Sequence, residues 1–142
     1  MELLGETVVV PRAVVVEVLA GPADDPVRKL AEAGRFRVQE PIPVPDAVLE
    51  WGLGAGESAV LAVARSERSA EAVLDDAQAR RCARALAVGV VGTLGLVIRA
   101  ARLGIVDAAA PIVRDLRAAG LRVDDALVAE VLRRAVGESW EP

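Results

Sequence analysis

Acidic side chains offer the most informative chemistry in this sequence. The chain contains no histidine, which excludes the usual general base, the usual zinc ligand and every histidine-dependent nucleophilic triad. Its single cysteine, Cys82, argues against a thiolate metal site. Catalysis would therefore rest on carboxylates, hydroxyls, arginines or a metal ion held by oxygen. The acidic candidates near strand-to-helix junctions are Glu17, Glu57, Asp75 and Asp76.

Short apolar strands precede these candidates. Asp75 and Asp76 follow a predicted strand at 72–74, and Thr93 follows another at 88–91. Ligands of an open parallel α/β sheet bind beyond the carboxyl ends of its strands. We therefore expect these side chains to face one binding edge. Glu17 lies in the helix after a first strand, at 7–10, and Glu57 begins the helix that precedes the aspartate pair.

Carboxylates brought together repel one another, and a hard divalent cation relieves that repulsion. Mg²⁺ or Mn²⁺ held by oxygen ligands can activate water and stabilise charge on a phosphate under attack. The acidic candidates therefore predict a Mg²⁺ or Mn²⁺ site.

Each candidate also has a purely structural interpretation. Asp75 with Gln78 matches a capping box at a helix N-terminus, and Thr93 matches a simple helix cap. Glu57 is favourable near the positive end of a helix dipole. Glu17 on an exposed flank can simply be solvated. The residue types alone leave both interpretations open.

Three arginines, Arg80, Arg81 and Arg84, are predicted on the face of the following helix that lies opposite its alanines. They can bind RNA phosphates beside the acidic group, or they can form an ordinary solvated face. The net charge of −4 argues against a general nucleic-acid binder but leaves room for a local basic patch.

Strands and helices alternate along the chain, which predicts an α/β fold with a parallel sheet between two helical layers. Helices are predicted near 11–20, 27–33, 57–68, 75–87, 93–103, 110–119 and 124–136, with further short strands at 36–38 and 121–123. One domain at 1–137 is expected, followed by a frayed tail at 138–142.

The longest uncharged stretch, residues 85–98, is shorter than the roughly 18 residues that suggest a membrane span. The N-terminus has no basic segment ahead of an apolar one, as a secretory signal would. We expect no membrane association, and the cytoplasm is the expected location.

Four segments in succession resemble the PIN-domain proteins of the VapC-like toxin group. Leu-Asp-Asp-x-x-Ala-Arg followed by Gly-Thr-Leu-Gly is the more specific part of the resemblance. The segments are Val8–Val18, Gly56–Ala62, Leu74–Arg80 and Gly92–Gly95.

The resemblance implies a compact α/β/α ribonuclease that uses about four acidic residues and Mg²⁺ or Mn²⁺. Glu17 would be the second acid, Asp76 or its neighbour Asp75 the third, and Glu57 an accessory acid. Thr93 matches a hydroxyl near the fourth acid. Gly95 stands where many relatives place that aspartate, so the fourth ligand is not assigned.

PIN-domain proteins open with a strand that ends in aspartate, followed by a helix. This sequence starts at Glu2-Leu3-Leu4, which we interpret as the end of that helix, so the fold is expected to be N-terminally incomplete and to lack the first catalytic aspartate. Loss of that strand would expose backbone donors and acceptors on the neighbouring strands, which would favour pairing with a second copy in a homodimer.

The resemblance predicts RNA as the substrate and an antitoxin protein as the partner. Two rival functions are a degenerate PIN module that binds a protein or nucleic acid without cutting it, and a small-molecule-binding domain whose acids are helix caps.

Overall fold

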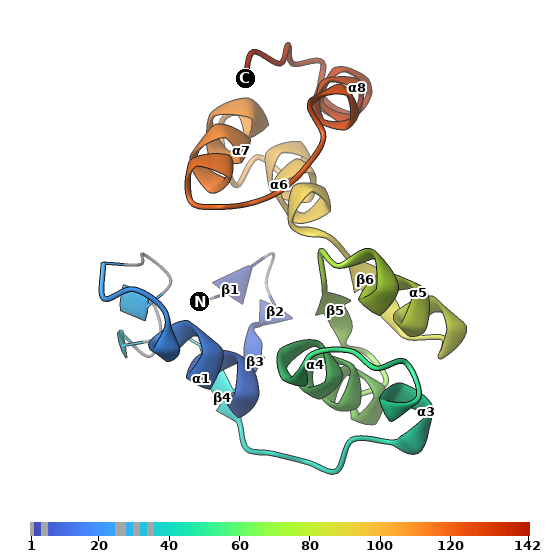
Figure 1. The fold of residues 1–142 in the computed structure, drawn as a ribbon. Helices are drawn as coiled ribbons and strands as arrows, with labels where there is room; N and C mark the ends of the chain where they lie inside the picture. The colour runs from blue at the N-terminus through green and yellow to red at the C-terminus, as the bar shows by residue number, and fades with distance from the viewer. Residues whose placement is uncertain (1, 4–5, 25–27, 30–31, 34–35) are drawn as a thin grey trace. The chain divides into compact units, whose positions relative to one another are not determined.

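The computed structural model describes residues 2–3, 6–24, 28–29, 32–33 and 36–142. The chain forms two compact units, residues 1–91 and 92–142 (Figure 1). The first unit carries strands and helices, and the second consists of helices joined by loops.

The N-terminal unit begins with strands. β1 (Glu2–Leu3) pairs with β2 (Glu6–Thr7) in antiparallel fashion, so the prediction of a helix end at residues 2–3 is wrong, and Leu4 lies outside the described residues. β3 (Val9–Pro11) pairs in parallel with β4 (Arg37–Gln39). A hairpin and a parallel pair thus precede and flank the first helix.

A second parallel pair forms from β5 (Glu71–Val73) and β6 (Gly89–Val91), with Ala72 opposite Val90. A helix connects the two strands, as parallel pairing requires. The parallel strands and their connecting helices confirm the predicted α/β class. In the described residues, each parallel pair is a two-stranded sheet of its own.

The helices of this unit are α1 (Arg12–Ala20), α3 (Asp46–Leu49), α4 (Ala55–Ser66) and α5 (Ala77–Ala85). Pro11, which was predicted to begin the first helix, is instead the N-cap of α1 and the last residue of β3. Most of these helices follow the predicted ranges, whereas α3 was not predicted. Part of the predicted helix at 27–33 lies outside the described residues.

The core of the N-terminal unit gathers around α4. This helix packs against α1, β3 and β5, and its buried Leu61 and Ala64 belong to the same apolar cluster as Ala72 of β5. α5 contributes Ala79 and Ala83, both fully buried, to the same cluster. α4 therefore lies against both the β3–α1 segment and the β5–α5 segment.

The C-terminal unit contains α6 (Thr93–Arg102), α7 (Ala109–Ala118) and α8 (Asp125–Val136) around a separate apolar cluster. The predicted strand at 121–123 is wrong. Leu121 instead donates its N–H to the carbonyl of Leu116 and closes the end of α7. In the described part of the chain, no helix is long and apolar enough to cross a membrane.

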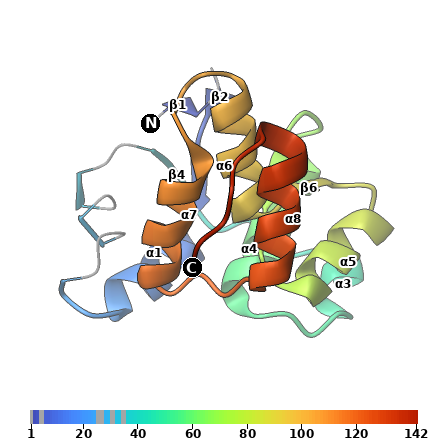
Figure 2. The same ribbon diagram turned by 90° about the horizontal axis from the view of Figure 1, so that it is seen from above.

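The tail after α8 is held in place rather than frayed. Both carboxylate oxygens of Glu138 accept hydrogen bonds from the first turn of α7, at 2.8 Å from Ala109 N and 2.7 Å from Ala110 N. Trp140 packs against the apolar cluster of this unit, and its Nε1 donates to Asp125 of α8 at 2.9 Å. Figure 2 shows the tail running between α7 and α8. These contacts could not be predicted from the sequence, because the residues that make them are far apart along the chain.

Candidate functional site

Glu17 reaches the N-terminus of α4. Its Oε1 accepts a hydrogen bond from Gly56 N at 3.0 Å, between residues far apart in the sequence. Gly54 is the N-cap of α4 and provides no side chain to cap the helix. The first N–H groups of a helix lack intrahelical partners and carry a partial positive charge, so they favour a carboxylate. The interpretation of Glu17 as a merely solvated residue is therefore wrong.

Glu57 lies in the same helical turn. Its side chain folds back so that Oε2 occupies the space beside the α-carbon of Gly54. The residue is half-buried, and its position in the first turn agrees with the predicted dipole interaction. The first turn of α4 therefore carries two carboxylates, one local and one supplied by α1.

Asp76 caps α5. Its Oδ1 accepts a hydrogen bond from Ala79 N at 2.8 Å, and the backbone of Asp76 is extended, as is usual for an N-cap. The predicted capping box of Asp75 with Gln78 is therefore wrong by one residue. Two adjacent aspartates made the choice ambiguous, because either can cap a helix that begins nearby.

Gln78 has a different role from the predicted one. Its Nε2 donates to the carbonyl oxygen of Trp51 at 2.7 Å. Trp51 lies in the segment that leads into Gly54 and α4, so this bond ties the first turn of α5 to the entrance of α4. The N-terminal turns of the two helices, with Glu17 and Asp76 on them, thus belong to one connected region. Sequence analysis missed this bond because an amide gives no sign of its distant partner.

The donors in this region are carboxylate oxygens, the type that Mg²⁺ and Mn²⁺ prefer. Among the described residues, however, no group of three or more histidine, cysteine, aspartate or glutamate side chains is close enough to hold a metal ion. The chemical type fits a hard cation, whereas the arrangement is not a ready metal cage.

The remaining predicted site residues lie on two helices. Thr93 is the first helical residue of α6 and Gly92 is the N-cap, so the prediction that Thr93 caps this helix is wrong. Thr93 belongs to the C-terminal unit. On α5, Arg81 and Arg84 are exposed and Arg80 is half-buried, which agrees with the predicted basic face.

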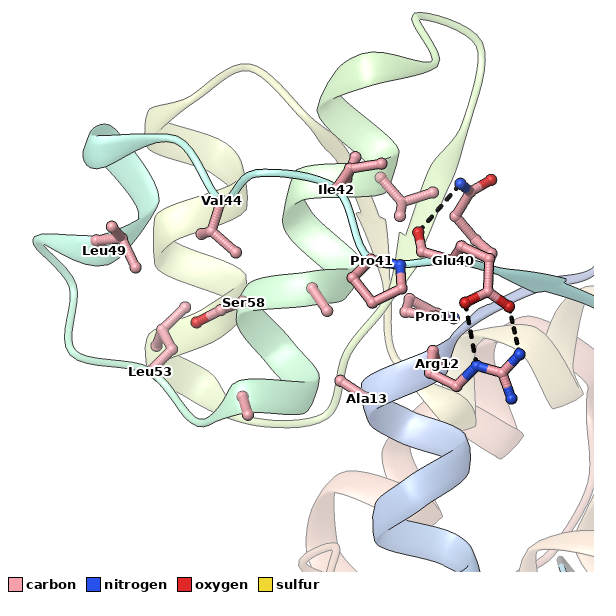
Figure 3. A pocket seen from close by; sticks show the side chains of 14 residues that line it. Pro11, Arg12, Ala13, Glu40, Pro41, Ile42, Val44, Leu49, Leu53 and Ser58 are labelled. Carbon is pink, nitrogen blue, oxygen red and sulfur yellow. Dashed lines mark hydrogen bonds and ion pairs between the residues drawn. The ribbon is translucent and has the colours of Figure 1, made fainter.

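A separate pocket of about 440 Å³ lies in the N-terminal unit, between the start of α1, the connection after β4 and the side of α4 (Figure 3). Two of its lining residues, Arg12 and Glu40, form a two-bond ion pair. The hydrogen bond from Arg12 lowers the pKa of the Glu40 carboxyl, and the same bond raises the pKa of Arg12. The walls are mostly apolar, including Ile42, Val44 and Leu53. The predicted acidic residues are not part of this pocket.

A comparison with protein families gives a match over residues 1–137 to a family model described as a PIN domain. The chain belongs to the PIN-domain family. The match runs through both compact units and stops where the C-terminal tail begins. No curated protein and no solved structure matches the chain.

Family membership confirms the resemblance at the level of the PIN domain. PIN domains generally use divalent metal ions, and membership points to nuclease chemistry and to RNA. The carboxylates at the two helix N-termini are oxygen donors of the type that suits such an ion.

Proposed function

We propose that this PIN domain is a metal-dependent endoribonuclease of the VapC-like toxin type. Its ligands would be Glu17, Glu57, Asp75 and Asp76. The observation that carries the proposal is that Glu17 and Asp76 come from separate β-α segments to two helix N-termini joined by the Gln78–Trp51 bond.

The contribution of each residue follows from its contacts. The hydrogen bonds engage Oε1 of Glu17 and Oδ1 of Asp76, so each bond orients its carboxylate through one of the two oxygens. A bound Mg²⁺ or Mn²⁺ would supply the positive charge that lets these carboxylates approach one another, and would activate water for attack on a phosphodiester. Arg81 and Arg84 on the exposed face of α5 would hold RNA phosphates.

A PIN module that binds RNA or a protein without cutting is the second candidate. The contacts of Glu17 and Asp76 favour it, because helix N-termini in the C-terminal unit accept carboxylates in the same way. Asp124 caps α8 by accepting from Leu127 N at 3.0 Å, and Glu138 caps α7. A purely structural role for all these acids would leave no catalytic set.

Asp76 and Asp124 form a matched pair that separates the candidates. Each is an N-cap whose side chain accepts a hydrogen bond from the backbone N–H three residues further along. Asn caps helices about as well as Asp, so Asp76→Asn and Asp124→Asn should each change the free energy of unfolding by less than about 1 kcal/mol.

Cleavage of a mixed RNA substrate with Mn²⁺ is the deciding measurement. We expect Asp76→Asn to lower the rate by about 100-fold or more, as expected for loss of a charged metal ligand, and Asp124→Asn to leave it unchanged. RNA binding without Mn²⁺-dependent cleavage by the unaltered chain would establish the non-cleaving module instead.

An antitoxin protein and a second copy of the chain are the proposed protein partners. Apolar side chains are exposed on α1 and β4, namely Val16, Leu19 and Val38. Exposed apolar side chains suit a protein contact where they lie together. A strictly monomeric sample in sedimentation would contradict the homodimer.

A further inference from the structure

The carboxylate of Glu17 lies where a side chain at position 56 would otherwise be. Gly56 is buried in the first turn of α4, and its N–H donates to Glu17 Oε1. A β-carbon built on Gly56 would lie 2.6 Å from Oε2 and 3.1 Å from Oε1 of the same carboxylate. Real β-carbons essentially never lie within 3.0 Å of such an atom. The carboxylate therefore fills the place of the side chain that Gly56 lacks.

The backbone gives no other reason for a glycine at this position. Gly56 is helical and is not among the residues with a positive φ, so its conformation is open to any amino acid. Glycine is also one of the least favourable residues within a helix. The space taken by Glu17 is thus the feature of the structure that accounts for the glycine.

We propose that Gly56 is the positioning residue for Glu17. Its amide fixes one carboxylate oxygen, and its missing side chain admits the other. The inference rests on the proposed function in one respect, namely that the positioned carboxylate serves as a metal ligand. Gly54 has a similar steric relation to Glu57, because a β-carbon on Gly54 would overlap Glu57 Oε2. The two glycines of this turn therefore accommodate two carboxylates.

A positioning role has a signature that differs from a structural one. The atoms that a methyl group at position 56 would displace are the far end of a flexible side chain, not backbone. Gly56→Ala should therefore fold with a stability close to that of the unaltered chain, since the preference of alanine for the helix offsets the loss of one hydrogen bond. What it should lose is the contact with Glu17.

Hydrogen exchange of the amide at position 56 tests this contact without any metal ion. We expect Glu17→Ala and Gly56→Ala each to raise exchange by about tenfold, after correction for the intrinsic rate of the residue at position 56. The double variant should exchange no faster than either single variant, because both act on one bond. Unchanged exchange in Glu17→Ala or Gly56→Ala would overturn the proposal.

Mn²⁺ titration measures what the positioning serves. If Glu17 is a ligand, Gly56→Ala should weaken Mn²⁺ binding by about tenfold or more, and should have no further effect in a Glu17→Gln background. Gly89→Ala is the control, since a β-carbon there would have no neighbour closer than 3.9 Å. Failure of the unaltered chain to bind Mn²⁺ would end the metal role of Glu17, while the exchange experiment would still decide the role of Gly56.

Discussion

Both units of the molecule bring a distant glutamate to the N-terminus of a helix, but they use it differently. In the N-terminal unit, Glu17 meets the first turn of α4 through a hydrogen bond to Oε1. In the C-terminal unit, Glu138 meets the first turn of α7 through hydrogen bonds to both oxygens. The N-caps of these helices, Gly54 and Ala108, make no side-chain cap of their own.

The difference indicates that Glu138 serves to cap α7, whereas the first turn of α4 orients the carboxylate of Glu17. Both carboxylate oxygens of Glu138 accept hydrogen bonds from backbone N–H groups. Trp140, two residues further along, packs against the apolar cluster of the same unit. Glu17 is exposed, and its hydrogen bond fixes its direction through one oxygen. Loss of Glu138 should therefore cost stability, and loss of Glu17 should cost function.

Removal of the tail should produce the largest loss of stability. A chain that ends at Gly137 loses the Glu138 bonds and the packing of Trp140, so we expect the free energy of unfolding to fall by about 3 kcal/mol in urea denaturation. A chain shortened only by Glu141 and Pro142 keeps both features and should fall by less than about 1 kcal/mol. Equal stability of the unaltered chain and the chain that ends at Gly137 would show that the tail contributes nothing to stability.

Substitution by glutamine should lower stability more at Glu138 and lower RNA cleavage more at Glu17. A glutamine has one acceptor oxygen and no charge, so Glu138→Gln should lower the free energy of unfolding by about 1 kcal/mol and leave RNA cleavage unchanged. Glu17→Gln should change stability by less than about 0.5 kcal/mol and lower cleavage by about 100-fold. Similar stability losses in the two variants would contradict the distinction.

Acid should loosen the tail through Asp125. The hydrogen bond from Trp140, followed by the interaction with Arg117, lowers the pKa of Asp125. A carboxyl with a lowered folded-state pKa stabilises the fold above its unfolded pKa of about 3.9, and this contribution disappears as the pH falls through the lower folded value. We expect the indole N–H resonance of Trp140 to shift in that acid range. An equally large shift in Asp125→Asn would assign the transition to another group.

Local patterns predicted much of the fold. The apolar periodicity of α4 to α8 depends on neighbouring residues, and those helices lie close to their predicted ranges. The strand predicted at 121–123 failed because the same residues close α7, where Gly120 has a φ of 111° and Leu121 bonds back to the helix. A short apolar run is compatible with both outcomes, and the fold around it decides.

The candidate site was predictable in its residue types but not in its contacts. Acidic residues near strand ends follow from the α/β pattern and from the family resemblance. The Glu17–Gly56 and Gln78–Trp51 bonds join segments far apart in the chain, so spacing contains no trace of them. The choice of Asp76 over Asp75 as the cap depends on where α5 begins, which the sequence leaves open by a residue.

The two tryptophans of the chain are divided between the two units. Trp51 packs against the apolar cluster of the N-terminal unit, and Trp140 packs against that of the C-terminal unit. Each unit therefore contains its own intrinsic fluorophore. A chain with one tryptophan replaced by phenylalanine would report the melting of one unit alone, so that the cooperativity between the two halves of this PIN domain becomes directly visible in emission spectra.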